Sequence, residues 1–174
     1  MLIQYTVRWN NIKENLFYLD AGLTEAEKQY ILHIHNKYRS SVANGKISKQ
    51  PPAQNMQVLK WDEELANVAQ TWANKCDYKH NTDRHVERFY VGENIAEVRS
   101  SAELELGDFA KQAVELWFDE YKIYKFGQAF SLSTGHYSQW IWAETNLIGC
   151  GFSYYYNERS RRYTKYYVCN YGPA

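Results

Sequence analysis

Two glutamates and two histidines are the side chains of this sequence whose types and settings point most directly to chemistry. Glu120 lies three residues after Trp117 and four after Leu116, so helical periodicity places it on an apolar stripe. A carboxylate that faces inward is costly unless it is paired or hydrogen-bonded. Glu120 is therefore either a functional group or a glutamate at the edge of the stripe that reaches solvent.

The other three candidates have less distinctive settings. Glu93 stands beside Gly92 in a predicted strand, as a functional group or a simple strand-end residue. His80 lies in a polar loop, where an exposed histidine is the commoner outcome, and His136 directly precedes an aromatic run. Neutral imidazoles can bind Zn²⁺ and carboxylates can act as general bases, but the spacing alone does not show that these groups meet.

Three predicted helices would help to position these groups. Thr24 and Glu27 have the spacing of a capping box, so the first helix begins there and ends near Gly45. Asp62 caps a second helix, and a third runs from about residue 108 to 124. The predicted inward-facing residues are Ile31, Ile34, His35 (a core histidine), Tyr38 and Val42, then Leu65, Ala66, Ala69, Trp72, Ala73 and Cys76, then Phe109, Ala113, Leu116, Trp117, Tyr121 and Tyr124.

Strands are predicted over residues 89–98 and, as a tyrosine-rich hairpin, over 147–156 and 163–171. Helices come mainly first and the hairpin last, with too few crossovers for a parallel sheet, which favours an α+β layered fold. Residues 1–22 lack clear periodicity and are interpreted as an N-terminal extension of uncertain structure. Residues 23–174 are interpreted as one domain.

The cysteines bear on the cellular compartment. If residues 157–162 form the hairpin loop, Cys150 and Cys169 fall opposite each other, at a separation that suits a disulfide. Such a bridge implies an oxidising compartment. Cys76 is then a thiol or half of a bridge to a partner outside this chain. The alternative is three reduced cysteines in a cytosolic protein.

Composition excludes several classes of protein. Among 174 residues, 20 Lys and Arg balance 20 Asp and Glu, so phosphate-driven nucleic-acid binding is not expected. A content of 45% hydrophobic and 17% aromatic residues argues against disorder, and no apolar run is long enough to span a membrane. Residues 1–18 lack the apolar core of a signal peptide, so a secreted protein would have a leader that was removed or that precedes this sequence.

Four strings of residues together match one family. They are His35-Asn36-Lys37-Tyr38-Arg39, Gly92-Glu93-Asn94-Ile95, Gly135-His136-Tyr137-Ser138-Gln139 with Trp142 and Thr145, and Tyr166-Tyr167-Val168-Cys169-Asn170-Tyr171-Gly172-Pro173. With them the chain resembles the CAP superfamily of cysteine-rich secretory, antigen 5 and pathogenesis-related type 1 proteins, and its ending is similar to the antigen 5 branch. The resemblance covers about residues 23–173.

The resemblance implies a three-layer α-β-α sandwich with a central antiparallel sheet. It also implies a cleft lined by His80, Glu93, Glu120 and His136. Three departures from the family pattern stand out. Trp140 replaces a smaller aliphatic residue, the sequence stops inside the last motif, and no cysteine precedes Cys76, which resembles a family cysteine that bridges to the N-terminal region.

By this resemblance the protein is expected to be a secreted, extracellular binding or effector protein, similar to venom or salivary antigen 5. His80 and His136 would bind Zn²⁺ or another divalent metal with modest affinity, because water must complete the shell. Glu93 and Glu120 would orient the two rings. A sterol or fatty acid, and a host or target receptor, are the further partners that the resemblance implies.

Two other functions use the same residues differently. A hydrolase would use a metal-bound water with Glu93 or Glu120 as general base, or Ser138 as a nucleophile near His136, although no oxyanion-hole motif supports it. A surface effector would bind a receptor or channel through loops 77–88, 125–135 and 157–162 and leave the cleft idle. Binding without turnover is favoured over catalysis.

Overall fold

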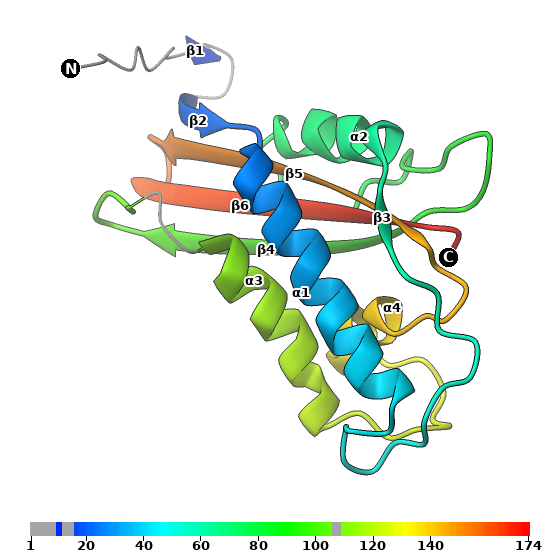
Figure 1. Ribbon diagram of the computed structural model, residues 1–174. Coiled ribbons are helices and arrows are strands. Elements are labelled where there is room, and N and C mark those ends of the chain that lie inside the picture. The colour runs from blue at the N-terminus through cyan, green and yellow to red at the C-terminus, as the bar shows by residue number, and fades with distance from the viewer. Residues whose placement is uncertain (1–9, 12–15, 106–108) are drawn as a thin grey trace.

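The computed structural model describes residues 10–11, 16–105 and 109–174 (Figure 1). The elements follow in the order β1 (Asn10–Asn11), β2 (Leu16–Ala21), α1 (Glu25–Ala43), β3 (Lys60–Trp61), α2 (Glu63–Ala73), β4 (Gly92–Ser100), α3 (Phe109–Asp119), η1 (Glu120–Lys122), η2 (Leu132–Thr134), α4 (Gly135–Trp140), β5 (Leu147–Asn157) and β6 (Arg162–Gly172), where η marks a single 3₁₀ turn.

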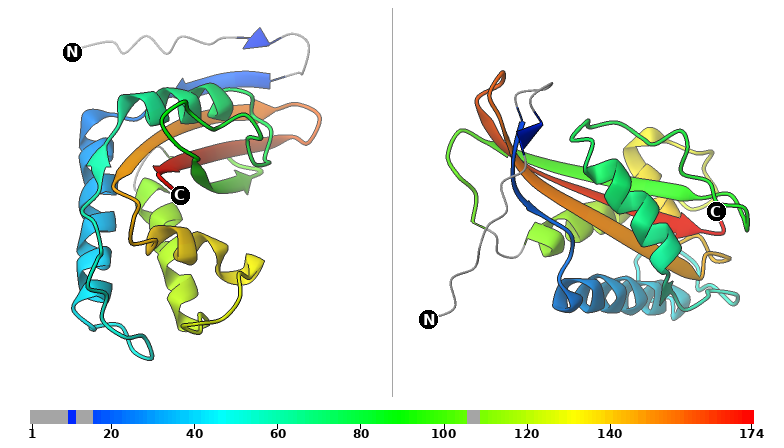
Figure 2. Two further views of the ribbon diagram at one scale, coloured as in Figure 1. Left: turned by 90° about the vertical axis from the view of Figure 1, so that its right-hand side faces the viewer. Right: turned by 90° about the horizontal axis from the view of Figure 1, so that it is seen from above.

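The strands form one sheet with helices on both faces. Its order is β1-β2-β5-β6-β4, every pair on that path is antiparallel, and the short β3 adds to β5 in parallel. Helix α2 covers one face, and α1 and α3 run side by side on the other (Figures 1 and 2). This confirms the three-layer α-β-α sandwich with a central antiparallel sheet.

The helix starts arise from local sequence signals. The Thr24 hydroxyl accepts from the Glu27 amide at 3.2 Å, and the Glu27 carboxylate accepts from the Thr24 amide at 2.8 Å, which closes the predicted capping box. Asp62 caps α2 by accepting from the Leu65 amide at 3.0 Å. Both predicted helix starts are confirmed.

Two glycines let α2 lie directly against the sheet. A side chain on Gly149 would come within 2.2 Å of the Ala66 backbone nitrogen, and one on Gly151 within 2.4 Å of the Gln70 backbone. The space that a Cβ would need is occupied by the helix backbone. The Gly-Cys-Gly string of β5 is therefore a packing feature of this sandwich.

The predicted disulfide is present. Cys150 and Cys169 are direct partners in the register of β5 and β6, with Cα atoms 4.1 Å apart, and their sulfurs are bonded. Both side chains are buried in the core between the sheet and helices α1 and α3. The bridge therefore ties the two central strands together inside the core.

We expect the double substitution Cys150→Ala, Cys169→Ala to lower the free energy of unfolding by about 3 kcal/mol. The bridge closes a loop with a sequence separation of 19 residues, and releasing a loop of this size gives the unfolded chain about that much conformational entropy. Urea unfolding measures the change, and Cys76→Ala is the control for loss of a thiol. An unchanged midpoint in the double variant would contradict the prediction.

The third helix is shorter than predicted, and the predicted inward positions of Ala113 and Trp117 are confirmed, whereas that of Leu116 is wrong. It ends at Asp119 and η1 follows, whereas the sequence predicted one helix to residue 124. Leu116, predicted to face inward, is 63% exposed, while Val114 and Phe118 are buried. Phe118, which was not predicted to face inward, stacks on Tyr38 of α1, with ring centroids 3.8 Å apart. The predicted inward position of Phe109 lies outside the described side chains.

Two further boundaries differ from the sequence analysis. No regular element was expected in residues 1–22, yet Leu16–Ala21 form β2, which pairs with β5. The segment forms a strand because it pairs with β5, although its own sequence shows no strand periodicity. The strand predicted over 89–98 is β4, which begins at Gly92 and continues to Ser100.

Candidate functional site

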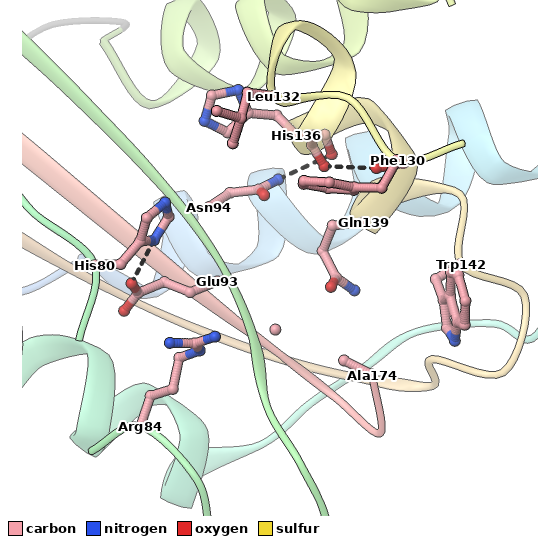
Figure 3. Close-up of a pocket in the computed structure, with 13 residues that line it drawn as sticks. His80, Arg84, Glu93, Asn94, Phe130, Leu132, His136, Gln139, Trp142 and Ala174 are labelled. Atoms are coloured by element: carbon pink, nitrogen blue, oxygen red, sulfur yellow. Dashed lines mark hydrogen bonds and ion pairs between the residues drawn. The ribbon is translucent and has the colours of Figure 1, made fainter. Parts of the chain in front are cut away.

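The four candidate side chains come from four segments and meet around one cleft. His80 lies in the loop after α2, Glu93 on β4, Glu120 in η1 and His136 on α4. A pocket of about 510 Å³ is lined by both histidines and Glu93 (Figure 3), while Glu120 is hydrogen-bonded to His136. Apolar side chains also line it, namely Phe130, Leu132 and Trp142.

The first pair joins the loop after α2 to β4. His80 Nδ1 lies 2.8 Å from Glu93 Oε1, which also accepts from the Asn81 amide at 2.9 Å (Figure 3). The Glu93 side chain is fully buried, whereas that of His80 is 58% exposed. Because a carboxylate can only accept, Nδ1 carries the proton and Nε2 of the neutral ring has a lone pair for a ligand.

The second pair repeats this arrangement on the helical side. His136 Nδ1 donates to Glu120 Oε1 at 2.6 Å, and Glu120 Oε2 accepts from the Tyr137 amide at 3.0 Å. The imidazole stacks on Trp117 with ring centroids 5.9 Å apart. Both carboxylate oxygens are therefore used, and Nε2 of His136 is again the nitrogen with the lone pair.

The setting of Glu120 differs from the helical stripe that the sequence suggested. Its neighbour at the expected position, Leu116, is exposed, and Glu120 itself begins the 3₁₀ turn that follows α3. The turn brings its carboxylate to the first turn of α4, where it meets an imidazole and a backbone amide. The hydrogen bonds offset the desolvation of the carboxylate.

Asn94 supports the site and was not singled out from the sequence. Its side-chain amide donates to the His136 carbonyl at 3.2 Å and to the Tyr171 hydroxyl at 3.3 Å. Tyr171 in turn bonds Nε2 of His35 at 2.9 Å, while His35 Nδ1 donates to the Ile31 carbonyl at 2.7 Å. The only available signal was its place directly after Glu93, as the third residue of a family motif.

The core histidine of this chain keeps one protonation state. His35 is completely buried, stacks on Trp140 at 3.7 Å and lies near the Arg39 guanidinium, and burial lowers its pKa to about 3. Because Nδ1 donates, Nε2 accepts the Tyr171 proton. Donation therefore runs from Asn94 at the cleft through Tyr171 and His35 to the Ile31 carbonyl of α1. The predicted role of His35 as a satisfied core residue is confirmed.

Gly92 of β4 leaves room for the Gln139 side chain of α4 at the pocket. A Cβ on Gly92 would come within 1.9 Å of Gln139 Oε1, so the Gln139 side chain would have to leave its present position. Gln139 also donates to the Thr145 hydroxyl at 3.4 Å. This contact joins two residues of the family motif that begins at Gly135. Gly92 and Gln139 therefore shape the pocket floor rather than supply chemistry.

Ser138 is not arranged as a nucleophile. Its hydroxyl donates to the Gly135 carbonyl at 2.9 Å within its own helix. His136 donates from Nδ1 to Glu120. Among the described residues, Ser138 makes no hydrogen bond to the His136 ring. Within the described residues, no group of three or more His, Cys, Asp or Glu side chains is placed to hold a metal ion. Metal binding here would rest on the two imidazoles.

Solved structures with the same architecture place this fold among the α-β-α sandwiches of venom allergen-like proteins. The structure of BmVAL-1 has a TM-score of 0.74 and 30% sequence identity, covering 87% of this chain and 79% of that chain. A crystal structure described as NaASP2 with Zn²⁺ has a TM-score of 0.71 and 33% identity, covering 88% of this chain and 82% of that one.

The family itself is shown by sequence. The family model described as CAP, the cysteine-rich secretory protein family, matches residues 32–171. Venom allergen 5 of Vespula vidua is 44% identical over 162 residues, 88% of this chain and 77% of the relative. Salivary antigen-5 of Triatoma infestans is 40% identical over 171 residues, 87% of this chain and 69% of the relative. The chain belongs to the CAP family and is similar to its venom allergen 5 members.

Among the described residues, no helix combines the length and the apolar character that crossing a bilayer requires.

Proposed function

We propose that this chain is a secreted, antigen 5-like binding protein whose cleft takes a divalent metal ion through His80 and His136. The observation that carries the proposal is the pair of histidines lining one pocket, each with Nδ1 fixed by a carboxylate. This arrangement leaves the lone pair of each neutral ring on Nε2 and raises its basicity. The relative crystallised with Zn²⁺ supports the same choice of metal.

The donor set fits a weakly held ion. A tight structural zinc site takes four protein ligands, whereas here two imidazoles leave the remaining positions to water or to a bound molecule. The metal would supply Lewis acidity to whatever completes its shell. The glutamates would hold the rings in place and keep them in the tautomer that binds.

Binding is favoured over hydrolysis because neither carboxylate has an oxygen that is both accessible and free of a hydrogen bond, since the unpartnered Oε2 of Glu93 is buried. Glu120 uses both oxygens in hydrogen bonds, and the Glu93 side chain has no exposed surface. A general base must reach the proton that it removes. The Ser138 hydroxyl is likewise engaged within its own helix. A Ser/His or metal-water hydrolase would need these groups to rearrange.

Secretion is supported by the disulfide and by the relatives. A buried bridge between the central strands suits an oxidising compartment. The similar proteins are named as venom and salivary proteins. We propose that the chain acts outside the cell.

An apolar ligand or partner is proposed at the mouth of the cleft. Phe130 and Leu132 are 75% and 88% exposed and Trp142 is 52% exposed, so the pocket carries large apolar side chains in contact with water. Such surface is typical of binding sites. A sterol, a fatty acid or an apolar patch of a receptor would cover it.

We expect Zn²⁺ titrated into the protein to bind at one site, and His80→Ala together with His136→Ala to abolish that binding. Glu93→Gln should weaken it by about 10- to 100-fold, because a neutral amide orients and polarises the ring less well. Isothermal titration calorimetry measures the affinities. His33→Ala, which removes an exposed histidine of α1, is the matched control and should bind as the native protein does.

The double variant should unfold cooperatively, since His80 is largely exposed and His136 lies at the pocket. Zinc affinity that persists unchanged in a folded double variant would overturn the metal assignment. An equal loss in His33→Ala would show instead that the ion binds surface histidines without a site.

A further inference from the structure

The cleft contains a cation that has no acidic partner. Arg84, in the loop after α2, is half-buried and lines the same pocket as the two histidines and Glu93. Among the described residues, no carboxylate forms an ion pair with Arg84. Arg88 of the same loop, by contrast, pairs with Asp62 at 2.9 Å and with Glu64 at 2.6 Å. Arg84 is therefore a positive charge in the pocket that is open to an anion.

The Arg84 guanidinium is held in place by backbone groups. Its Nε donates to the Val91 carbonyl at 2.8 Å, and its Nη1 donates to the Asn81 carbonyl at 2.7 Å. The Asn81 amide in turn donates to Glu93 Oε1 at 2.9 Å. Because these bonds fix the side chain before any ligand arrives, little further entropy would be lost on binding.

The remaining nitrogen of the guanidinium, Nη2, is left for a ligand. A guanidinium has five N–H groups, and within the described part of the chain Arg84 donates only from Nε and Nη1. Nη2 is not one of the buried atoms that lack a partner, so water can reach it. Figure 3 shows the guanidinium turned toward the interior of the pocket. A carboxylate placed there would accept charge-assisted hydrogen bonds.

The charges of the cleft favour a ligand with a single negative charge. When a divalent ion occupies the cleft, its two charges are matched by Glu93 and Glu120, since histidines bind a metal as neutral rings. The charge of Arg84 then remains unmatched among the residues that line the pocket. Without the ion, Glu93 repels an anion in the same pocket. The ion and the anion should therefore strengthen each other's binding.

We propose that Arg84 is the anion-binding residue of the cleft, and that the cleft takes a small molecule with one carboxylate attached to an apolar group. The carboxylate would accept from Arg84 Nη2, and the apolar group would pack on the exposed side chains of Phe130, Leu132 and Trp142. A pocket of about 510 Å³ suits a molecule of this kind. Arg84 would thus select the ligand of the proposed binding cleft, and its role rests on that proposed function.

4-Phenylbutyrate and 4-phenylbutanamide make a matched pair of probes, because they have nearly the same shape and differ in the negative charge. We expect the acid to bind zinc-loaded protein about tenfold more tightly than the amide, as expected for a charge-assisted hydrogen bond. The preference should be smaller in metal-free protein. In ¹H–¹⁵N spectra the acid should shift the side-chain Nε–H signal of Arg84 and leave that of Arg88 in place. Equal affinities of the two probes in both forms of the protein would overturn the proposal.

Arg84→Gln separates recognition by the arginine from direct coordination of the ion. The variant should bind the acid and the amide equally, and it should bind zinc at least as tightly as the native protein does, because a nearby positive charge is removed. Arg88→Gln, which removes a cation outside the pocket, should keep the tenfold preference. A preference that survives in a folded Arg84→Gln variant would mean that the carboxylate binds elsewhere, and would contradict the assignment.

Failure of the metal site and failure of the anion site give different results. If zinc does not bind the native protein, the metal assignment is wrong, while the comparison of acid and amide in metal-free protein still decides whether Arg84 binds an anion. If Arg84→Gln folds poorly, the Nε–H signal of Arg84 in the native protein decides the same question. An Arg84 signal that does not move at saturating 4-phenylbutyrate would overturn the proposal.

Discussion

Replacing Arg39 with Met is expected to lower the free energy of unfolding by about 4 kcal/mol, a large fraction of the stability of a domain of this size. The guanidinium is 2% exposed and donates to five backbone carbonyls, those of Gln57, Trp140, Trp142, Ala143 and Thr145. Methionine fills much of the volume but leaves these acceptors without a donor. Urea unfolding monitored by circular dichroism measures the loss.

The charge of Arg39 and the fork of its donors contribute separately. Burial lowers the pKa of Arg39 to about 10, so it remains charged at neutral pH. Arg39→Lys keeps a cation but offers one compact group of donors, so it should recover less than half of the loss. Lys37→Met changes an exposed residue of the same helix and should move stability by less than about 0.5 kcal/mol. A loss below about 1 kcal/mol in Arg39→Met would show that the carbonyls find other donors.

The same substitution tests how the fold supports the cleft. Arg39 binds the carbonyls that end α4 and begin the connection to β5, and α4 carries His136. We infer that loosening this connection would also weaken zinc binding, although Arg39 does not line the pocket. Stability and zinc affinity should therefore both fall in Arg39→Met, and both should remain at the native values in Lys37→Met.

Local signals account for the features that the sequence predicted well. The capping box at Thr24, the cap at Asp62 and the position of Cys150 opposite Cys169 depend on residues close in the chain or on a single hairpin. Each of these features can be predicted without information about the packing of the rest of the molecule. All three are confirmed by the structure.

Features set by distant partners were predicted less well. The periodicity of α3 placed Ala113 and Trp117 correctly but not Phe118, which stacks on Tyr38 of another helix. β2 exists because β5 offers it an edge, although its own sequence shows no alternation. In both cases tertiary packing overrides the local pattern.

The candidate site shows the same division. Motifs shared with a family pointed to His80, Glu93, Glu120 and His136, and the structure brings them together as two pairs. Residue spacing alone could not pair them, since each comes from a different segment. Asn94 escaped notice because its role depends on two partners far away in the chain.

Acid should destabilise this protein through His35, by about 3 kcal/mol between pH 7 and pH 4. Burial lowers the pKa of His35 to about 3 in the folded state, against 6.5 for an unperturbed histidine. Between these values the unfolded chain binds a proton that the native state excludes. The contribution is therefore fully present above about pH 6.5 and is lost as the pH falls, with a slope of about 1.4 kcal/mol per pH unit.

His35→Phe isolates this contribution because the ring still packs on Trp140 but cannot titrate. The variant should be less stable at pH 7, since the Tyr171 hydroxyl loses its acceptor and the Ile31 carbonyl its donor. That deficit should shrink by about 3 kcal/mol at pH 4, whereas His33→Ala should track the native protein throughout. Parallel pH profiles of the native protein and His35→Phe would mean that the imidazole is protonated in the folded core. The hydrogen bond from Tyr171 to His35 would then have to be reversed, with the imidazole donating to the Tyr171 hydroxyl.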